Sequence, residues 1–136
     1  MKIYKIIIIE NDEDEQFFMR EGFDKVGLFQ ILAMCRNGEE LFEWLAAHPI
    51  VIPELFLSDL NMPGKNGYDI IEEVKAHPVY SDIPVVITST SSTPAIIKKC
   101  LDKGAADYLV KPDTFIEYET YVKSLHQRIE EKKLVK

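Results

Sequence analysis

One stretch decides the expected fold: Leu55-Phe56-Leu57-Ser58-Asp59-Leu60-Asn61-Met62-Pro63-Gly64. Its apolar start is too short for a helix and is typical of a strand that is buried on both faces. The run stops at Asp59, and the turn residues Pro63 and Gly64 then end the segment. In a parallel sheet the functional residues lie at the carboxyl ends of the strands, so Asp59 stands where chemistry is expected.

Short apolar runs of the same kind alternate with longer segments that have helical spacing. The runs expected to form strands are Lys5–Ile9, Phe29–Met34, Leu55–Ser58, Val85–Thr88 and Tyr108–Val110. The segments expected to form helices are Glu13–Val26, Glu39–Ala47, Tyr68–Ala76, Pro94–Lys103 and Phe115–Leu134. This alternation predicts an α/β fold in which right-handed crossovers place helices on both faces of a parallel sheet.

Capping residues and apolar spacing predict the limits and faces of these helices. Thr93 and Pro94 are typical of a helix start, and Gly104 is typical of a helix end. Asp113 or Thr114 is expected to cap the last helix. The first helix is expected to bury one face, formed by Phe17, Phe18, Gly22 and Val26.

Length and composition bound the class of protein. The chain has 136 residues, 46% hydrophobic and 29% charged, which predicts a single domain over residues 1–136 with no second domain. The net charge of −7 argues against nucleic acid or an anionic membrane as partner, because both attract positive surfaces. No signal peptide is visible and no apolar run approaches the ~20 residues that span a bilayer, so a cytoplasmic protein is expected.

Cys35 and Cys100 are the two cysteines of the chain. They lie far apart and neither belongs to a CxxC or Cys/His pattern, so a zinc site is not expected. Their apolar or helical neighbours indicate buried, reduced thiols.

Polar residues follow four of the five expected strands. They are Glu10, Asn11 and Asp12 after the first, Asp59 and Asn61 after the third, Ser89 and Thr90 after the fourth, and Lys111 after the fifth. Parallel strands end at one edge, where clustered carboxylates repel each other unless a cation neutralises them. Mg²⁺ does this with oxygen ligands, so Glu10 and Asp59 are its expected ligands, together with the backbone carbonyl of Asn61.

The same residues suit phosphoryl transfer. The Asp59 carboxylate can accept a phosphoryl group as an acyl phosphate. The transfer requires positioning and charge neutralisation, for which Lys111 supplies a fixed positive charge and Ser89 a hydroxyl donor.

Each of these residues, taken alone, also has a structural interpretation. Asp59 could cap a turn, Lys111 could be a solvated loop residue, and Ser89 could bond to the backbone. The acids Glu13, Asp14 and Glu15 are most simply first-turn residues that the helix dipole favours. The joint placement at successive strand ends favours the functional interpretation.

Three segments resemble one known family, the receiver domains of response regulators. Pro53–Gly64 is similar to the phosphoacceptor segment, Ile83–Ser89 to the switch-hydroxyl segment, and Gly104–Pro112 to the lysine segment. The resemblance covers nearly the whole chain and rests on three ordered motifs. It implies a CheY-like, flavodoxin-like fold with a five-stranded parallel sheet in the order 2-1-3-4-5.

The resemblance also implies roles for individual residues. The main ones are Asp59 as phosphoacceptor, Ser89 as the hydroxyl that turns toward the phosphoryl group, and Lys111 as the ion-pair partner of that group. Tyr108 would be the aromatic residue whose inward or outward rotamer reports the state. Asn61 and Ser91, each two positions beyond a motif residue, would help to set the lifetime of the acyl phosphate.

The implied function is a single-domain response regulator that a histidine kinase or a phosphotransfer protein phosphorylates and that signals by protein contact, not as an enzyme. Ala76–Pro84 resembles single-domain receivers that pair with bacteriophytochrome kinases. The alternative is a pseudo-receiver that docks partners without phosphorylation. A small-molecule phosphatase is least favoured, because no substrate pocket with a separate general base is indicated. The last helix could pack on its own sheet or extend a dimer face, so the protein could be a monomer or a homodimer.

The chain departs from the family at one metal position. Receiver domains usually carry two adjacent acids after the first strand, and here the pair is Glu10 and Asn11. The amide oxygen of Asn11 can still coordinate Mg²⁺ directly or through a water, but it lacks charge and is expected to weaken the binding. Asp12 could compensate if the loop shifts by one residue. Since Asp59, Ser89 and Lys111 are all present, a working receiver is the favoured interpretation.

Overall fold

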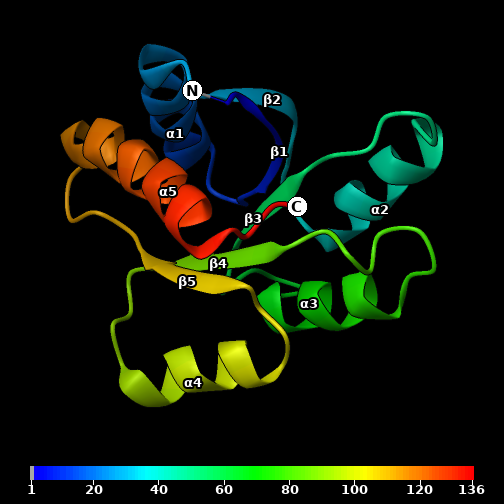
Figure 1. The fold of residues 1–136 in the computed structure, drawn as a ribbon. Coiled ribbons are helices and arrows are strands. Elements are labelled where there is room, and N and C mark those ends of the chain that lie inside the picture. The colour runs from blue at the N-terminus through cyan, green and yellow to red at the C-terminus, as the bar shows by residue number, and fades with distance from the viewer. Residues whose placement is uncertain (1) are drawn as a thin grey trace.

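The fold is a five-stranded parallel sheet with the strand order β2-β1-β3-β4-β5, seen in a computed structural model that describes residues 2–136 and, at Phe115, the backbone alone (Figure 1). The strands are β1 Tyr4–Ile9, β2 Phe29–Cys35, β3 Leu55–Asp59, β4 Val85–Ser89 and β5 Asp107–Val110. The helices are α1 Glu13–Val26, α2 Gly38–Ala47, α3 Gly67–Ala76, α4 Pro94–Asp102 and α5 Tyr118–Lys132. The predicted flavodoxin-like α/β fold is confirmed.

Helices cover both faces of the sheet (Figure 1). On β1, Ile6 and Ile8 contribute to the core under α1 and α5. Ile7 and Ile9 contribute to the core under α2, α3 and α4. All four side chains are fully buried, which explains why this strand reads as one continuous apolar run instead of alternating with polar residues.

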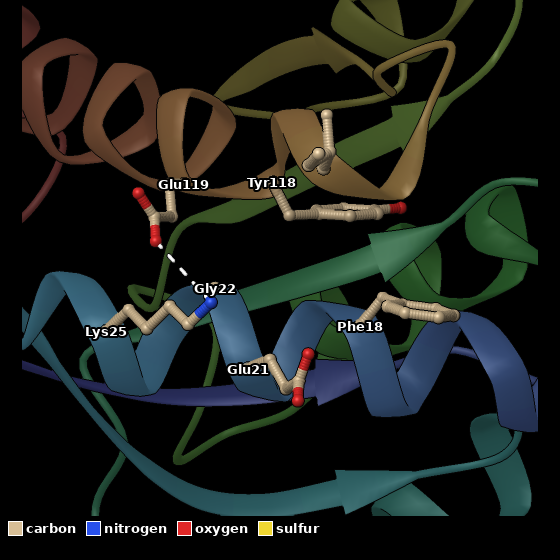
Figure 2. Close-up of a pocket in the computed structure, with 7 residues that line it drawn as sticks. Phe18, Glu21, Gly22, Lys25, Tyr118 and Glu119 are labelled. Atoms are coloured by element: carbon tan, nitrogen blue, oxygen red, sulfur yellow. Dashed lines mark ion pairs between the residues drawn. The ribbon is translucent and has the colours of Figure 1, made fainter.

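The helices α1 and α5 pack closely against each other, and Gly22 permits this contact. A Cβ atom added at Gly22 would lie 2.9 Å from the Cβ of Tyr118, closer than such atoms can approach. Figure 2 shows the contact, with Phe18 on α1 and an ion pair of 3.8 Å between Lys25 and Glu119. These residues line a pocket between the two helices.

The buried face of α1 is rotated from the predicted one. Its buried residues are Met19, Gly22 and Phe23, whereas the Phe17 side chain is 58% exposed, so its predicted burial was wrong. Phe17 lies roughly half a turn from Met19 around the helix, because each residue advances an α-helix by about 100°. Met19 and Phe23 therefore pack in the core against the sheet, and Phe17 faces away from it.

The helix ends are set partly by side chains and partly by the backbone. Gly104 follows α4 with a φ of 113°, as expected for a glycine after a helix. The last helix begins later than predicted, because a 3₁₀ turn at Phe115–Glu117 precedes α5 and Glu117 is its N-cap. The predicted cap by Asp113 or Thr114 was therefore wrong. No helix among residues 2–136 combines the length and the apolar composition that crossing a membrane requires.

Both cysteine side chains are buried and free, as predicted. Burial raises the pKa of the Cys35 thiol to about 12, and the nearby Glu40 carboxylate adds to the effect. A thiol with such a pKa is inert near neutral pH. The two cysteines are therefore part of the core.

Candidate functional site

The candidate site lies at the carboxyl edge of the sheet. Asp59 is the last residue of β3 and Ser89 is the last residue of β4. Glu10 directly follows β1 and Lys111 directly follows β5. Glu10, Asp59, Ser89 and Lys111 are all buried although they are polar. Segments up to 101 residues apart in the chain thus meet at one edge.

Lys111 lies among the carboxylates at this edge. Its Nζ atom lies 2.8 Å from Glu10 Oε1, 3.2 Å from Asp59 Oδ1 and 3.0 Å from Glu15 Oε2. The lysine side chain is only 6% exposed. A buried ammonium group that contacts three carboxylates leaves an excess of negative charge, which favours the binding of a cation at this edge.

Hydrogen bonds between the strands fix the position of Lys111. Its backbone N–H donates to the carbonyl of Ser89 at 2.8 Å. One residue earlier on β4, the Thr88 hydroxyl donates to the carbonyl of Leu109 at 2.8 Å and accepts from the Tyr121 hydroxyl at 2.7 Å. These bonds join β4, β5 and α5 just beneath the site.

Burial and the neighbouring charges set the protonation of the cluster. Burial is the main cause that raises the pKa of Glu10 to about 7, while Lys111 acts in the opposite direction. Burial also raises the pKa of Asp59, again against the effect of Lys111. For Lys111, burial alone would lower the pKa, but the carboxylates of Glu10 and Asp59 outweigh it and the pKa is raised. The lysine therefore carries its positive charge throughout the neutral range.

The residues present fit a Mg²⁺ ion that is held by few protein ligands. Within residues 2–136, no three His, Cys, Asp or Glu side chains are arranged as a metal cage. The carboxylates of Glu10 and Asp59 nevertheless lie at the same edge of the sheet, where both contact Lys111 Nζ, and Mg²⁺ commonly uses one or two carboxylates and keeps several waters. Asn61, whose backbone carbonyl was the third predicted ligand, is exposed and lies two residues beyond Asp59.

The two residues after Glu10 differ in what they offer a metal ion. Asn11 is exposed at the rim of the site. The carboxylate of Asp12 accepts the backbone N–H of Glu15 at 2.9 Å and thereby caps α1. One oxygen of Asp12 is therefore used by the helix, which argues against Asp12 as a substitute ligand.

The residues expected to form the switch lie beside the cluster. The Ser89 hydroxyl accepts the backbone N–H of Ser91 at 3.2 Å. Tyr108 lies in an inward orientation: the residue is 5% exposed, and its hydroxyl donates to the carbonyl of Ser91 at 2.7 Å. Ser89 and Tyr108 are thus linked through Ser91 in the loop between β4 and α4.

Sequence reasoning missed Glu15 as a site residue. It had been grouped with Glu13 and Asp14 as a first-turn acid, but its side chain is half-buried and contacts both Lys111 and the Tyr118 hydroxyl. The N-cap at Asp12 is the signal that could have identified it. A cap at Asp12 fixes the start of α1, and therefore which of the three acids turns toward the strand ends.

Comparison with known proteins agrees with this geometry. Residues 6–123 match the family described as the response regulator receiver domain. The transcriptional regulatory protein MalR of Bacillus subtilis is 30% identical over 115 residues, which are 85% of this chain and 47% of that protein. The two-component response regulator ARR9 of Arabidopsis thaliana is 43% identical over 65 residues, which are 48% of this chain and 28% of that protein. The chain thus spans about half or less of the length of these relatives.

Solved structures show the same likeness. The phosphorylated cyanobacterial phytochrome response regulator RcpA is 26% identical, with a TM-score of 0.80 over 92% of each chain. The Mn²⁺-bound form of the response regulator Rcp1 has a TM-score of 0.74 at 22% identity and covers 91% of this chain and 92% of its own. Receiver domains act as regulatory phosphoacceptors in two-component systems and generally bind Mg²⁺. The sheet order, the polar residues at its carboxyl edge and the match over residues 6–123 together place this chain in the response regulator receiver domain family.

Proposed function

We propose that this chain is a phosphorylation-dependent signalling protein in which Asp59 accepts a phosphoryl group from a histidine kinase or a phosphotransfer protein. The observation that carries the proposal is the buried contact of 3.2 Å between Lys111 Nζ and Asp59 Oδ1, beside Glu10. This contact pairs a nucleophile with a fixed positive charge at the place where a phosphoryl group would be added.

The transfer follows from the chemistry of these groups. A carboxylate oxygen of Asp59 attacks the phosphorus of a phosphohistidine, the P–O bond forms as the P–N bond breaks, and the imidazole leaves. Lys111 neutralises part of the charge on the phosphoryl oxygens. When bound by Glu10, Asp59 and the Asn61 carbonyl, Mg²⁺ supplies further neutralisation of that charge. With the amide of Asn11 in place of an acid, this site binds the ion more weakly than a site with two adjacent acids.

The response to phosphorylation involves Ser89, Tyr108 and Ser91. The Ser89 hydroxyl bonds to Ser91, and a phosphoryl group on Asp59 offers it a stronger, charged acceptor. A turn of Ser89 toward that group would release the Ser91 N–H. Because Tyr108 donates to the Ser91 carbonyl, the change passes to β5 and α4. Asn61 and Ser91 border the site and are placed to affect the lifetime of the acyl phosphate.

We propose further that the protein acts as a single-domain regulator in the cytoplasm and signals through protein contact. The net charge of −7 disfavours nucleic acid and anionic membranes as partners. The phosphoryl transfer leaves the protein itself modified, so it is a regulator and not an enzyme. Monomer and homodimer remain alternatives for its state of assembly.

A kinase of the phytochrome class is the more specific candidate for the donor. The likeness that favours it is the one to RcpA, a phytochrome response regulator, at 26% identity over 92% of both chains. The segment Ala76–Pro84 supports the same assignment, because it resembles the corresponding part of such single-domain receivers.

Intact-mass spectrometry after incubation with acetyl phosphate tests the proposal. The expected result is a Mg²⁺-dependent phosphoryl adduct that is absent from Asp59→Asn. Absence of the adduct from the unaltered protein across a wide range of Mg²⁺, and also with a phosphorylated histidine kinase as donor, would overturn the proposal. The docking pseudo-receiver would then be the better account.

A further inference from the structure

Glu15 is a third carboxylate at the phosphoacceptor edge. It lies in the first turn of α1, and its side chain is 21% exposed. Its Oε2 atom lies 3.0 Å from Lys111 Nζ and accepts a hydrogen bond of 3.0 Å from the Tyr118 hydroxyl. Two separate elements, the end of β5 and the start of α5, therefore hold this carboxylate against the lysine.

The donor capacity of Lys111 makes this contact important. A lysine ammonium group has three N–H donors. Its three carboxylate neighbours, Glu10, Asp59 and Glu15, lie within 2.8 to 3.2 Å. The contact with Glu10 is a hydrogen bond and those with Glu15 and Asp59 are ion pairs, so three carboxylates already surround the ammonium group that a phosphoryl oxygen would approach. One of the three carboxylates must therefore give up its contact with Lys111 when a phosphoryl group binds.

Of the three carboxylates, Glu15 can give up its contact with Lys111 at the lowest cost in free energy. The Glu10 side chain is 2% exposed and that of Asp59 is 10% exposed, so neither can reach solvent easily. Glu15 is more exposed and keeps a second partner in the Tyr118 hydroxyl. A carboxylate that retains a hydrogen bond and some water loses less when an ion pair breaks.

We propose that Glu15 is a positioning residue that competes with the phosphoryl group for Lys111. In the unphosphorylated protein it occupies one N–H of the lysine, and on phosphorylation that N–H passes to a phosphoryl oxygen. Its negative charge also opposes the approach of the anionic group. The inference rests on the proposed phosphorylation of Asp59 and adds a residue that lowers the affinity of the site for a phosphoryl group.

The α1–α5 contact keeps Glu15 in place for this competition. Gly22 brings α1 close to Tyr118, as Figure 2 shows, and Tyr118 lies buried against the helix. The Tyr118 hydroxyl then reaches Glu15, which precedes Gly22 on the same helix. The position of the carboxylate is thus set by packing between two helices and not by the lysine alone.

Beryllofluoride, a stable analogue of the phosphoryl group, provides the test. Fluorine NMR in the presence of Mg²⁺ reports the bound analogue directly, so its affinity can be measured without turnover. Glu15→Gln, which keeps the shape and removes the charge, is expected to bind beryllofluoride about three- to tenfold more tightly, the range for one partly exposed ion pair. Glu13→Gln is the matched control. It removes the same charge from the same turn of α1 at an exposed position and is expected to stay within about twofold.

The outcomes separate the two proposals. Equal or weaker binding by Glu15→Gln, with normal binding by the unaltered protein, would overturn the role of Glu15 and leave the proposed function intact. An equal gain in Glu13→Gln would also overturn it, because it would show a general charge effect. If the unaltered protein gives no bound signal that depends on Asp59, the proposed function and this inference both fail. Should Glu15→Gln be poorly folded, Glu15→Ala carries the same expectation.

Discussion

Lys111 donates a hydrogen bond of 2.8 Å to Glu10, a residue 101 positions earlier in the chain. Both side chains are buried. Glu10 follows β1 and Lys111 follows β5, two strands that β3 and β4 separate in the sheet. The sheet therefore brings opposite charges together at a depth where neither could remain alone. Removing either charge is expected to affect phosphoryl transfer and stability in different ways.

Lys111→Ala is expected to slow phosphorylation of Asp59 by acetyl phosphate by about a hundredfold, because a fixed positive charge at the reacting group is lost. The rate can be followed by intact-mass spectrometry in saturating Mg²⁺. Lys103→Ala, which alters a partly exposed lysine directly after α4, serves as the control and should leave the rate unchanged. A loss of less than about threefold for Lys111→Ala would contradict this role of Lys111.

Asp59→Asn is expected to raise the free energy of unfolding by about 1 kcal/mol when no Mg²⁺ is present. The pKa of Asp59 is raised in the folded protein, chiefly by burial, so its ionised form is disfavoured by folding near neutral pH. An amide of the same shape removes that cost. Urea unfolding in the presence of EDTA measures the effect, and a variant less stable than the unaltered protein would refute it.

Asp107→Asn is expected to lower the free energy of unfolding near neutral pH by about 1–3 kcal/mol. The Asp107 carboxylate accepts from Arg128 Nε at 2.7 Å, and Lys132 lies at 3.2 Å, so these contacts tie β5 to α5. Although burial raises its pKa, the hydrogen bonds from Arg128, the Tyr108 N–H and Lys132 outweigh burial and lower it.

The pH dependence of this loss has a definite sign. Because the folded pKa of Asp107 lies below the unfolded value, the carboxylate stabilises the protein fully above about pH 4 and loses its effect as the pH falls through the folded pKa. The difference between the unaltered protein and Asp107→Asn should therefore be constant from neutral pH down to about pH 5 and shrink below about pH 4. Urea titrations over this range measure it, and a difference that grows on acidification would be inconsistent with the ion pair.

Gly22→Ala is expected to destabilise the protein by about 1–3 kcal/mol, since the added Cβ would meet the Tyr118 side chain and backbone. Thermal unfolding measures the loss. Arg20→Ala, at an exposed position on the same helix, is the control and should change stability by less than about 0.5 kcal/mol. Equal stability of Gly22→Ala and the unaltered protein would show that α1 and α5 separate without cost.

The limits of most strands and helices could be predicted from the sequence, because apolar runs and turn residues pointed the same way. The strand order followed from the resemblance of three ordered motifs to receiver domains. The rotation of α1 could not be predicted, and the burial of Phe17 was predicted wrongly for that reason. The helix contains more apolar residues than its buried face needs, so packing against α5 at Gly22 decides which of them face the core.

The contact between Glu15 and Lys111 was hidden for a related reason. Glu13, Asp14 and Glu15 are alike as first-turn acids, and spacing alone does not show which of them approaches the strand ends. The Asp12 cap and the Tyr118 hydroxyl select Glu15, and Tyr118 lies 103 residues away in the chain. Such a choice depends on tertiary packing, which local sequence patterns do not contain.

The chain of hydroxyl groups from Tyr121 through Thr88 to the Leu109 carbonyl joins one helix and two strands beneath Ser89 and Lys111. These hydrogen bonds hold β4, β5 and α5 together, so we expect a change at the site to alter the loops beyond the strands more than the sheet itself. If Asp59 is phosphorylated as proposed, the resulting change would pass through the hydrogen bonds of Ser91 with Ser89 and Tyr108 and not through the core. The signal would then reach the surface as a change in loop conformation while the sheet keeps its structure. A partner protein could recognise that change without any unfolding of the domain.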